Sequence, residues 1–292
     1  MVCRRRSASA TTLSSSVICL SAVQNRRWAP LIDALERERA RKAEAVVRLE
    51  KKRKPLSKEQ SEGVERVWKP STSPWSSRIL QGRDLATLRE GERLNDEIVN
   101  ISFQMLSDRV GMISSTQPRI HVFSSFFMKR LYDNKKYNYD NVKKWTSRLN
   151  YDVLSCDQIF LPIHIKDHWI LGKVDTLEKR IVLYDSVGGA RRDAQGFVTS
   201  VKRWIAEEAR RNKLQQDWFQ NVSEWTEEFP TDIPRQSNQC DCGVFIIMYA
   251  DYLCAGAELE RSFSNEDVKH FRAHLLYDII QYVAKQNESI QQ

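Results

Sequence analysis

The run from Gly243 to Leu253, GVFIIMYADYL, places the tightest constraint on the fold, because Asp251 is its only charged residue. As a helix it would be apolar on nearly every side, and helices of that kind lie in the centre of a domain. Asp241 precedes the run and has a side chain suited to a helix cap. We therefore expect a central helix that opens at Asp241 and carries Cys242 in its first turn.

Three short apolar runs before the central helix are typical of strands. They are rich in β-branched and aromatic residues, and turn-like residues separate them. They cover residues 158–165, 168–175 and 180–187. The close spacing predicts three neighbouring strands of an antiparallel meander.

Helical periodicity predicts the elements around these strands. A helix starts at Asn95 or Asp96, and its buried face consists of Ile98, Val99, Ser102, Met105 and Leu106. A second helix starts at Ser124 or Ser125, with the apolar positions Phe126, Phe127 and Leu131. Further helical patterns cover residues 142–149, 190–213 and 265–285. The patterns together predict an α+β domain, with a mostly antiparallel central sheet covered by helices.

The net charge of +8 belongs to the N-terminal segment. Residues 1–60 hold 15 Lys and Arg against 6 Asp and Glu, whereas the other 232 residues hold 31 basic and 32 acidic groups. A basic face for duplex binding on the main domain therefore lacks its simplest support. Nucleic-acid binding through residues 1–60 is the weaker alternative.

The segment before the main domain has three parts. Residues 1–30 contain no acidic residue and many Ser, Thr and Arg, a composition shared by transit peptides and disordered tails. Residues 31–54 resemble a solvated helix that ends in the basic run Lys51–Lys54, which predicts nuclear localisation, with the cytoplasm or an organelle as alternatives. Residues 57–77 are polar and read as a linker. The predicted domains are a basic extension over residues 1–74, disordered or partly helical, and a folded domain over 75–288.

Two further patterns bear on the cellular setting. The six cysteines follow no disulfide framework, so they favour a reducing compartment. No window approaches the ~18 consecutive apolar residues of a membrane-spanning helix, so no membrane partner is expected.

Cys242 is the best candidate for a nucleophile. At a helix N-terminus the backbone N–H groups favour thiolate over thiol, whereas Cys240 lies in the loop and lacks that support. Gln236 lies in the same loop, and its amide could complete an oxyanion hole. His168 opens the second predicted strand and Asp185 ends the third, so the two side chains can meet if those strands pair.

Zinc binding is a rival interpretation of the same region. His164 and His168, together with Cys240 and Cys242, supply four ligand atoms of suitable chemistry. The C-x-C spacing is shorter than structural zinc sites use, and the two pairs lie about 75 residues apart in the chain. We therefore predict no metal.

Four segments, in this order, resemble the ubiquitin-like-specific cysteine proteases, the SUMO (sentrin) protease family. They are LNDEIVN (94–100), IFLPIHIKDHWILGKVD (159–175), IVLYDSVGG (181–189) and QSNQCDCGVF (236–245). The resemblance implies a papain-like cysteine protease fold of the Ulp type, with the central helix starting at the nucleophile. It also implies a deSUMOylating isopeptidase without cofactor, which cleaves after the Gly-Gly tail of SUMO in conjugates or precursors.

The resemblance also implies a role for each matching residue. His168 matches the general base, Asp185 the triad acid and Cys242 the nucleophile, and Gln236 matches the oxyanion-hole glutamine. Among substrate-binding positions, Asp96 matches a contact to the modifier and Trp169 matches a tryptophan that clamps the Gly-Gly tail.

Arg93 departs from the family pattern, which has tryptophan at this position as the other wall of the Gly-Gly tunnel. A guanidinium plane can cover a peptide, but it does not replace an indole. Three alternatives follow from this departure: the same fold acting on another ubiquitin-like modifier, as deneddylases do, a related thiol acyltransferase, and a weakly active modifier-binding protein.

Overall fold

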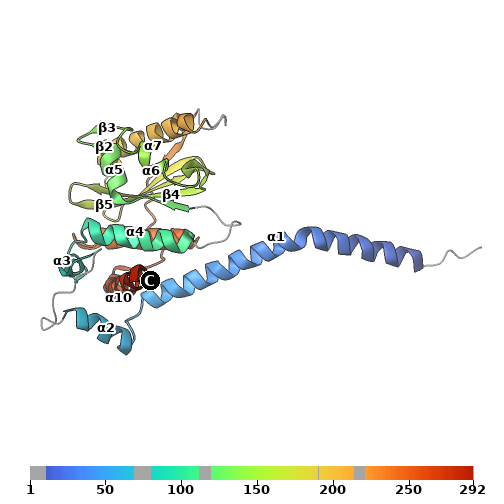
Figure 1. The fold of residues 1–292 in the computed structure, drawn as a ribbon, viewed down its shortest axis with the longest axis horizontal. Helices are drawn as coiled ribbons and strands as arrows, with labels where there is room; N and C mark the ends of the chain where they lie inside the picture. The colour runs from blue at the N-terminus through green and yellow to red at the C-terminus, as the bar shows by residue number, and fades with distance from the viewer. Residues whose placement is uncertain (1–10, 69–79, 112–119, 190, 214–220, 292) are drawn as a thin grey trace, which may run out of the picture. The chain divides into compact units, whose positions relative to one another are not determined.

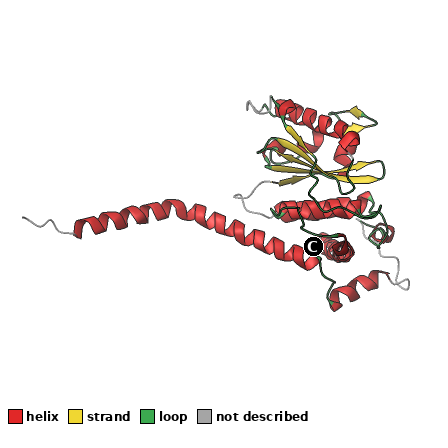
Figure 2. Cartoon of the chain, turned by 180° about the vertical axis from the view of Figure 1, so that it is seen from behind, coloured by secondary structure: helices red, strands yellow, loops and turns green. Residues whose placement is uncertain are grey.

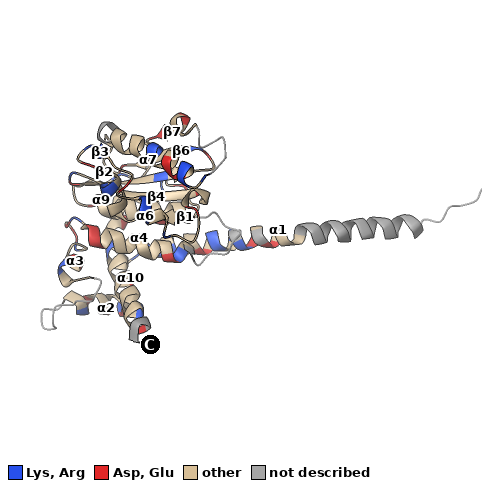
Figure 3. Ribbon diagram, turned by 45° about the horizontal axis from the view of Figure 1, so that its top comes forward, with Lys and Arg blue, Asp and Glu red and all other residues tan. Residues whose placement is uncertain are grey.

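The computed structural model describes residues 11–68, 80–111, 120–189, 191–213 and 221–291. Contacts within the chain divide it into two units, Met1–Glu44 and Ala45–Gln292. In the first unit, residues from Thr11 onward belong to helix α1 (Thr11–Lys52). Its described part carries interspersed basic and acidic side chains (Figure 3), as the solvated-helix prediction requires. The predictions for residues 1–10 lie outside the described residues.

The second unit is built on a five-stranded sheet (Figure 1). Strands β4 (Gln158–Ile165), β5 (His168–Asp175) and β6 (Arg180–Tyr184) pair antiparallel, which confirms the predicted meander. Strands β1 (Ile120–Val122) and β7 (Thr226–Glu228) add parallel edges beside β4 and β6. A small hairpin, β2 (Tyr132–Asp133) with β3 (Lys136–Tyr137), lies outside this sheet.

Helices cover both faces of the sheet (Figures 1 and 2). On one face lie α4 (Asp96–Gly111), α9 (Cys242–Cys254) and α10 (Asn265–Gln291). On the other lie α5 (Ser125–Leu131), α6 (Lys143–Thr146) and α7 (Arg191–Arg211). Alternate residues of β4 point to opposite cores, Phe160 to the first and Ile159 and Leu161 to the second. This two-sided burial explains why the central strands read as continuous apolar runs.

Helix α9 is the central helix expected from the sequence. It begins at Cys242, and eleven of its residues are buried. The capping prediction for Asp241 is wrong in one respect, because its side chain makes no capping hydrogen bond and pairs with Arg272 instead. In α4 the cap is Asn95, whose Oδ1 accepts the backbone N–H of Ile98 at 3.1 Å.

Helix α5 differs from its prediction in the face that it buries. Phe127 and Leu131 are fully buried, whereas Phe126 is 37 % exposed and Met128 takes the expected core position. A seven-residue helix has only two turns, so apolar spacing along it defines its buried face poorly.

The linker predicted for residues 57–77 is wrong in its first part, where helix α2 (Lys58–Trp68) forms. Residues 69–77 lie outside the described residues. Val64 of α2 and Leu49 at the end of α1 are buried in the same core cluster as helix α9. The remaining short helical segments are α3 (Gly82–Ala86), η1 (Val153–Ser155) and η2 (Val222–Glu224).

Asp251, the one charge of the apolar run, is buried on α9 and neutralised by three cations. Arg48 and Arg109 donate to its Oδ1 at 2.8 and 2.5 Å, and Lys52 lies 3.5 Å from Oδ2. Burial alone would raise the pKa of this carboxyl, but the charges of Lys52, Arg109 and Arg48 lower it far below its usual range. The end of α1 is therefore bound to α9 by ion pairs as well as by Leu49.

No helix among the described residues has both the length and the apolar character needed to span a bilayer.

Candidate active site

Cys242 lies at the first position of α9 with 2 % of its surface exposed. Burial raises the pKa of its thiol, but hydrogen bonds from His168 and from the backbone N–H groups of Trp169 and Gly243 outweigh burial and lower it. The pKa of Cys240 is raised instead, by burial and by the charge of Asp241. The two cysteines thus differ in the direction that the sequence predicts.

His168 and Asp185 meet at one end of the sheet. His168 opens β5 and Asp185 directly follows β6, and the antiparallel pairing of these strands places the two ends together. The Nε2 atom of His168 lies 2.7 Å from Oδ1 of Asp185, which leaves Nδ1 for the thiol of Cys242. Burial lowers the pKa of His168, but the hydrogen bonds and charges of Asp185 and Cys242 raise it to about 9.

Gln236 is held by two polar neighbours. Its Oε1 accepts the Ser186 hydroxyl at 2.6 Å, its backbone N–H donates to the Ser186 carbonyl at 3.1 Å, and its Nε2 donates to the Asn238 carbonyl at 2.6 Å. Ser186 is fully buried, so the amide orientation is determined by the protein interior. The second Nε2 hydrogen is the donor that an oxyanion would need. Sequence reasoning missed Ser186 and Asn238.

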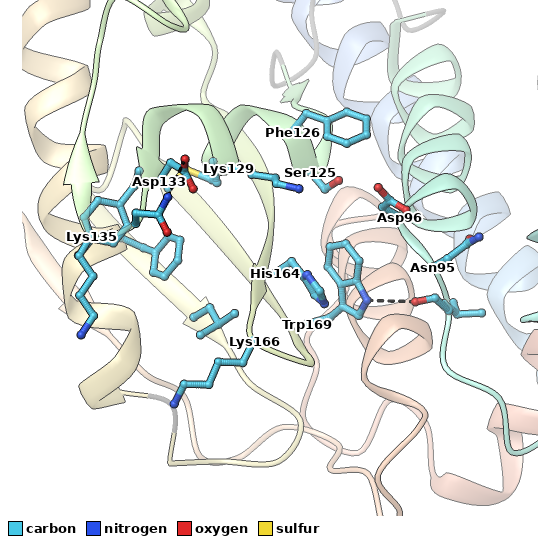
Figure 4. A pocket seen from close by; sticks show the side chains of 16 residues that line it. Asn95, Asp96, Ser125, Phe126, Lys129, Asp133, Lys135, His164, Lys166 and Trp169 are labelled. Atoms are coloured by element: carbon cyan, nitrogen blue, oxygen red, sulfur yellow. Dashed lines mark hydrogen bonds between the residues drawn. The ribbon is translucent and has the colours of Figure 1, made fainter.

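Trp169 and Leu94 line the approach to Cys242. The indole Nε1 donates to the Leu94 carbonyl at 3.3 Å, and the Trp169 ring lies 4.4 Å from the ring of His164 (Figure 4). Arg93 is exposed, and its Nη1 donates to the carbonyl of Asp167 at 3.3 Å. The loop before α4 and the β4–β5 turn are therefore joined across this approach.

A cavity of about 730 Å³ opens beside Trp169. Figure 4 shows Asp96, at the first position of α4, and Phe126, from α5, at the side of the cavity nearest Trp169. Lys129, Lys135 and Lys166 add positive charge to its lining. Among these residues the sequence indicated Asp96 and Trp169 and missed Phe126 as a surface residue.

The zinc interpretation has little support in this geometry. His168 is bonded to Asp185, and the ring of His164 packs on Trp169. Within the part of the chain that the structure describes, no group of three or more His, Cys, Asp or Glu residues could hold a metal ion.

Gly243 provides the space for Leu94. A Cβ atom at Gly243 would lie 2.9 Å from the Cβ of Leu94, closer than real Cβ contacts come. Gly243→Ala is therefore expected to lower the free energy of unfolding by about 1–3 kcal/mol, measured by denaturant titration. Gly63→Ala is the matched control, since its nearest neighbour would lie at 3.9 Å. Equal stabilities of the two variants would contradict the close packing of Leu94.

The arrangement defines a class of protein. A central helix that begins at a cysteine and packs against a mostly antiparallel sheet, whose strand ends join a histidine to an aspartate, is the papain-like cysteine protease fold. The predicted fold class is therefore confirmed. Residues 92–286 match the Ulp1 protease family, C-terminal catalytic domain, so the chain belongs to this family.

Relatives share this part of the chain. The chain is 32 % identical over 240 residues to ubiquitin-like-specific protease 1A of Arabidopsis thaliana, covering 79 % of the chain and 46 % of that protein. It is 31 % identical over 211 residues to human sentrin-specific protease 2, covering 72 % of the chain and 33 % of that protein. The chain thus spans about half or less of the length of these two relatives.

A solved structure shows the same fold. The C-terminal Ulp1 protease domain, solved in complex with SMT3, the yeast ortholog of SUMO, superimposes with a TM-score of 0.65 at 24 % identity. The match covers 78 % of this chain and 96 % of that domain.

Proposed function

We propose that this protein is a cysteine protease that cleaves after the Gly-Gly tail of SUMO, in conjugates, precursors or both. The observation that carries the proposal is the contact chain Cys242, His168 and Asp185 with Gln236 beside it. The names of the relatives, a sentrin-specific and a ubiquitin-like-specific protease, support the substrate class. The SMT3 complex of the Ulp1 domain supports the partner.

The chemistry follows from the two pKa shifts. A lowered thiol pKa and an imidazole pKa of about 9 favour transfer of the Cys242 proton to His168, giving a thiolate beside an imidazolium. The thiolate attacks the carbonyl carbon of the terminal glycine, and the Cys242 N–H and the Gln236 amide hold the oxyanion. His168 then gives its proton to the leaving amine, which departs and leaves a thioester. Water, deprotonated by His168, hydrolyses the thioester and regenerates the thiol.

The approach beside Trp169 and Leu94 suits a tail without side chains. Both residues are buried and joined by the indole hydrogen bond, so they form a firm wall next to Cys242. Asp96, exposed at the start of α4, is placed to contact the folded part of the modifier.

Arg93 favours a second candidate, in which the same chemistry acts on another ubiquitin-like modifier. Its guanidinium group bridges to Asp167 where the family pattern has an indole. An exposed cation at this position selects for a different tail or neighbouring surface than an aromatic ring does. The thiol acyltransferase and the weakly active binding protein follow from the same change in the wall.

Activity probes decide between these functions. The purified protein is incubated with SUMO, ubiquitin and NEDD8 that each carry a C-terminal electrophile, and intact mass is measured. A SUMO adduct mapped to Cys242 supports the proposal, and labelling by another modifier alone selects the second candidate. SUMO binding without an adduct, in a folded protein, selects the binding protein. Transfer of an acyl group to an amine at a rate above hydrolysis would identify the acyltransferase.

The pH dependence of cleavage tests the assignment of His168. We expect kcat/KM to fall above about pH 9, where His168 loses the proton that the leaving amine requires. Asp185→Asn removes a charge and a hydrogen bond that raise this pKa, so the alkaline limb should move to lower pH. An alkaline limb at the same pH in the variant, measured over pH 6–11 (roughly the range that spans both limbs), would contradict the pairing.

We further propose nuclear localisation, which the basic run Lys51–Lys54 supports. Lys52 and Arg53 are engaged in ion pairs with Asp278 and Asp267, whereas Lys51 and Lys54 are exposed. The variant Lys51→Ala/Lys54→Ala keeps both ion pairs and is expected to lower the nuclear fraction of a fluorescent fusion. Lys135→Ala/Lys136→Ala removes two exposed charges elsewhere and serves as the control. An unchanged nuclear fraction would show that the basic run is no signal.

A further inference from the structure

Arg272, on helix α10, is a buried cation that serves two segments at once. Its Nε and Nη2 donate to Oδ1 of Asp241 at 3.0 and 2.5 Å. Nη1 donates to the carbonyls of Thr87 and Arg89 at 3.2 and 3.1 Å, and Nη2 donates to the carbonyl of Glu92 at 2.7 Å. The side chain is 3 % exposed, so these contacts form away from solvent.

Both segments lead directly to the approach to Cys242. Asp241 precedes Cys242 in the chain, and its carbonyl accepts the N–H of Phe245 in the first turn of α9. Residues 87–92 continue into Arg93 and Leu94. The carbonyl of Leu94 accepts the Trp169 indole, and its side chain fills the space over Gly243.

The geometry requires a guanidinium group. A planar group with five N–H donors can reach a carboxylate on one side and several carbonyls on the other. Asp241 balances its charge, as a buried cation requires. A lysine could keep the ion pair with Asp241, but a single ammonium cannot reach all three carbonyls of the loop.

We propose that Arg272 is a positioning residue, which sets the width of the passage to Cys242 by holding loop 87–94 against the start of helix α9. Arg272 acts on access rather than on the sulfur itself. The contacts that lower the Cys242 pKa come from His168, Trp169 and Gly243. Loss of Arg272 should therefore impair ligands that thread the passage and spare small reagents. The proposal relies on the proposed function only for the Gly-Gly tail as the ligand of this passage.

The test compares reagents of different size on Arg272→Ala and Arg272→Lys. Iodoacetamide reports the thiol, a short peptide ending in a Gly-Gly chloromethyl ketone reports the passage, and the SUMO probe reports the full ligand, each mapped to Cys242 by peptide mass. We expect the two Gly-Gly reagents to lose about 100-fold in rate. The iodoacetamide rate and its pH midpoint should match those of wild type.

Arg53→Ala is the matched control, because it removes an ion pair to Asp267 on α10 without touching loop 87–94. It should leave all three rates unchanged. If all three rates fall together in a folded Arg272 variant, or if none falls, the positioning role is overturned. Should Arg272→Ala not fold, as judged by circular dichroism, the lysine variant decides: full rates with the Gly-Gly reagents would overturn the proposal. A wild-type protein that reacts with the peptide but with no modifier probe would refute the proposed function and leave the test of Arg272 intact.

Discussion

Replacing Cys242 by alanine is expected to lower the cleavage rate of a Gly-Gly fusion by at least about 10⁴-fold. The reason is that no other group in the site can form the thioester: His168 and Asp185 are bonded to each other, and Gln236 is held by Ser186 and Asn238. The fold should persist, because the change removes one sulfur atom from a buried position. Cleavage is measured by gel or fluorescence, and folding by thermal unfolding.

Cys240→Ala is the matched control for this variant. The two cysteines lie two residues apart, but Cys240 is only half-buried and its thiol pKa is raised. We expect this variant to keep most of the wild-type rate. Cleavage that survives in Cys242→Ala and is lost in Cys240→Ala would move the nucleophile to the loop and refute the contact chain described above.

Local patterns were sufficient to predict the parts of the site that lie at the ends of regular elements. His168 and Asp185 could be placed together because antiparallel strands that follow each other in sequence bring their ends to the same edge. Cys242 could be singled out because a helix N-terminus has a known effect on a thiol. These inferences need only the sequence within each element and the pairing of neighbouring strands.

The parts that could not be predicted depend on partners distant in sequence. Ser186 orients Gln236 across 50 residues, and Arg272 reaches the loop carbonyls across 180 to 185 residues. The same long-range ion pair takes the Asp241 side chain away from the capping role that local rules assign to it. Strands β1 and β7 were missed because each has three residues, too few to show a period.

The boundary predicted near residue 75 separates the folded domain from its extension, and truncation tests it. We expect removal of residues 1–74 to lower the free energy of unfolding by about 3–5 kcal/mol relative to removal of residues 1–44. The longer truncation takes away Arg48 and Lys52, which leaves Asp251 with Arg109, and it also removes the buried Leu49. A loss of this size is a large fraction of the stability of an ordinary domain.

The longer truncation should also lower the reactivity of Cys242 with Gly-Gly probes. Trp68, at the end of α2, packs under the guanidinium group of Arg89 at 4.6 Å, and Arg89 belongs to the loop whose carbonyls Arg272 holds. Removing Trp68 therefore loosens one side of the same loop. Leu49→Ala in the full-length chain is the control, because it should lower stability and leave the probe rate unchanged. Two truncations of equal stability and equal probe rate would place the start of the folded domain near residue 75.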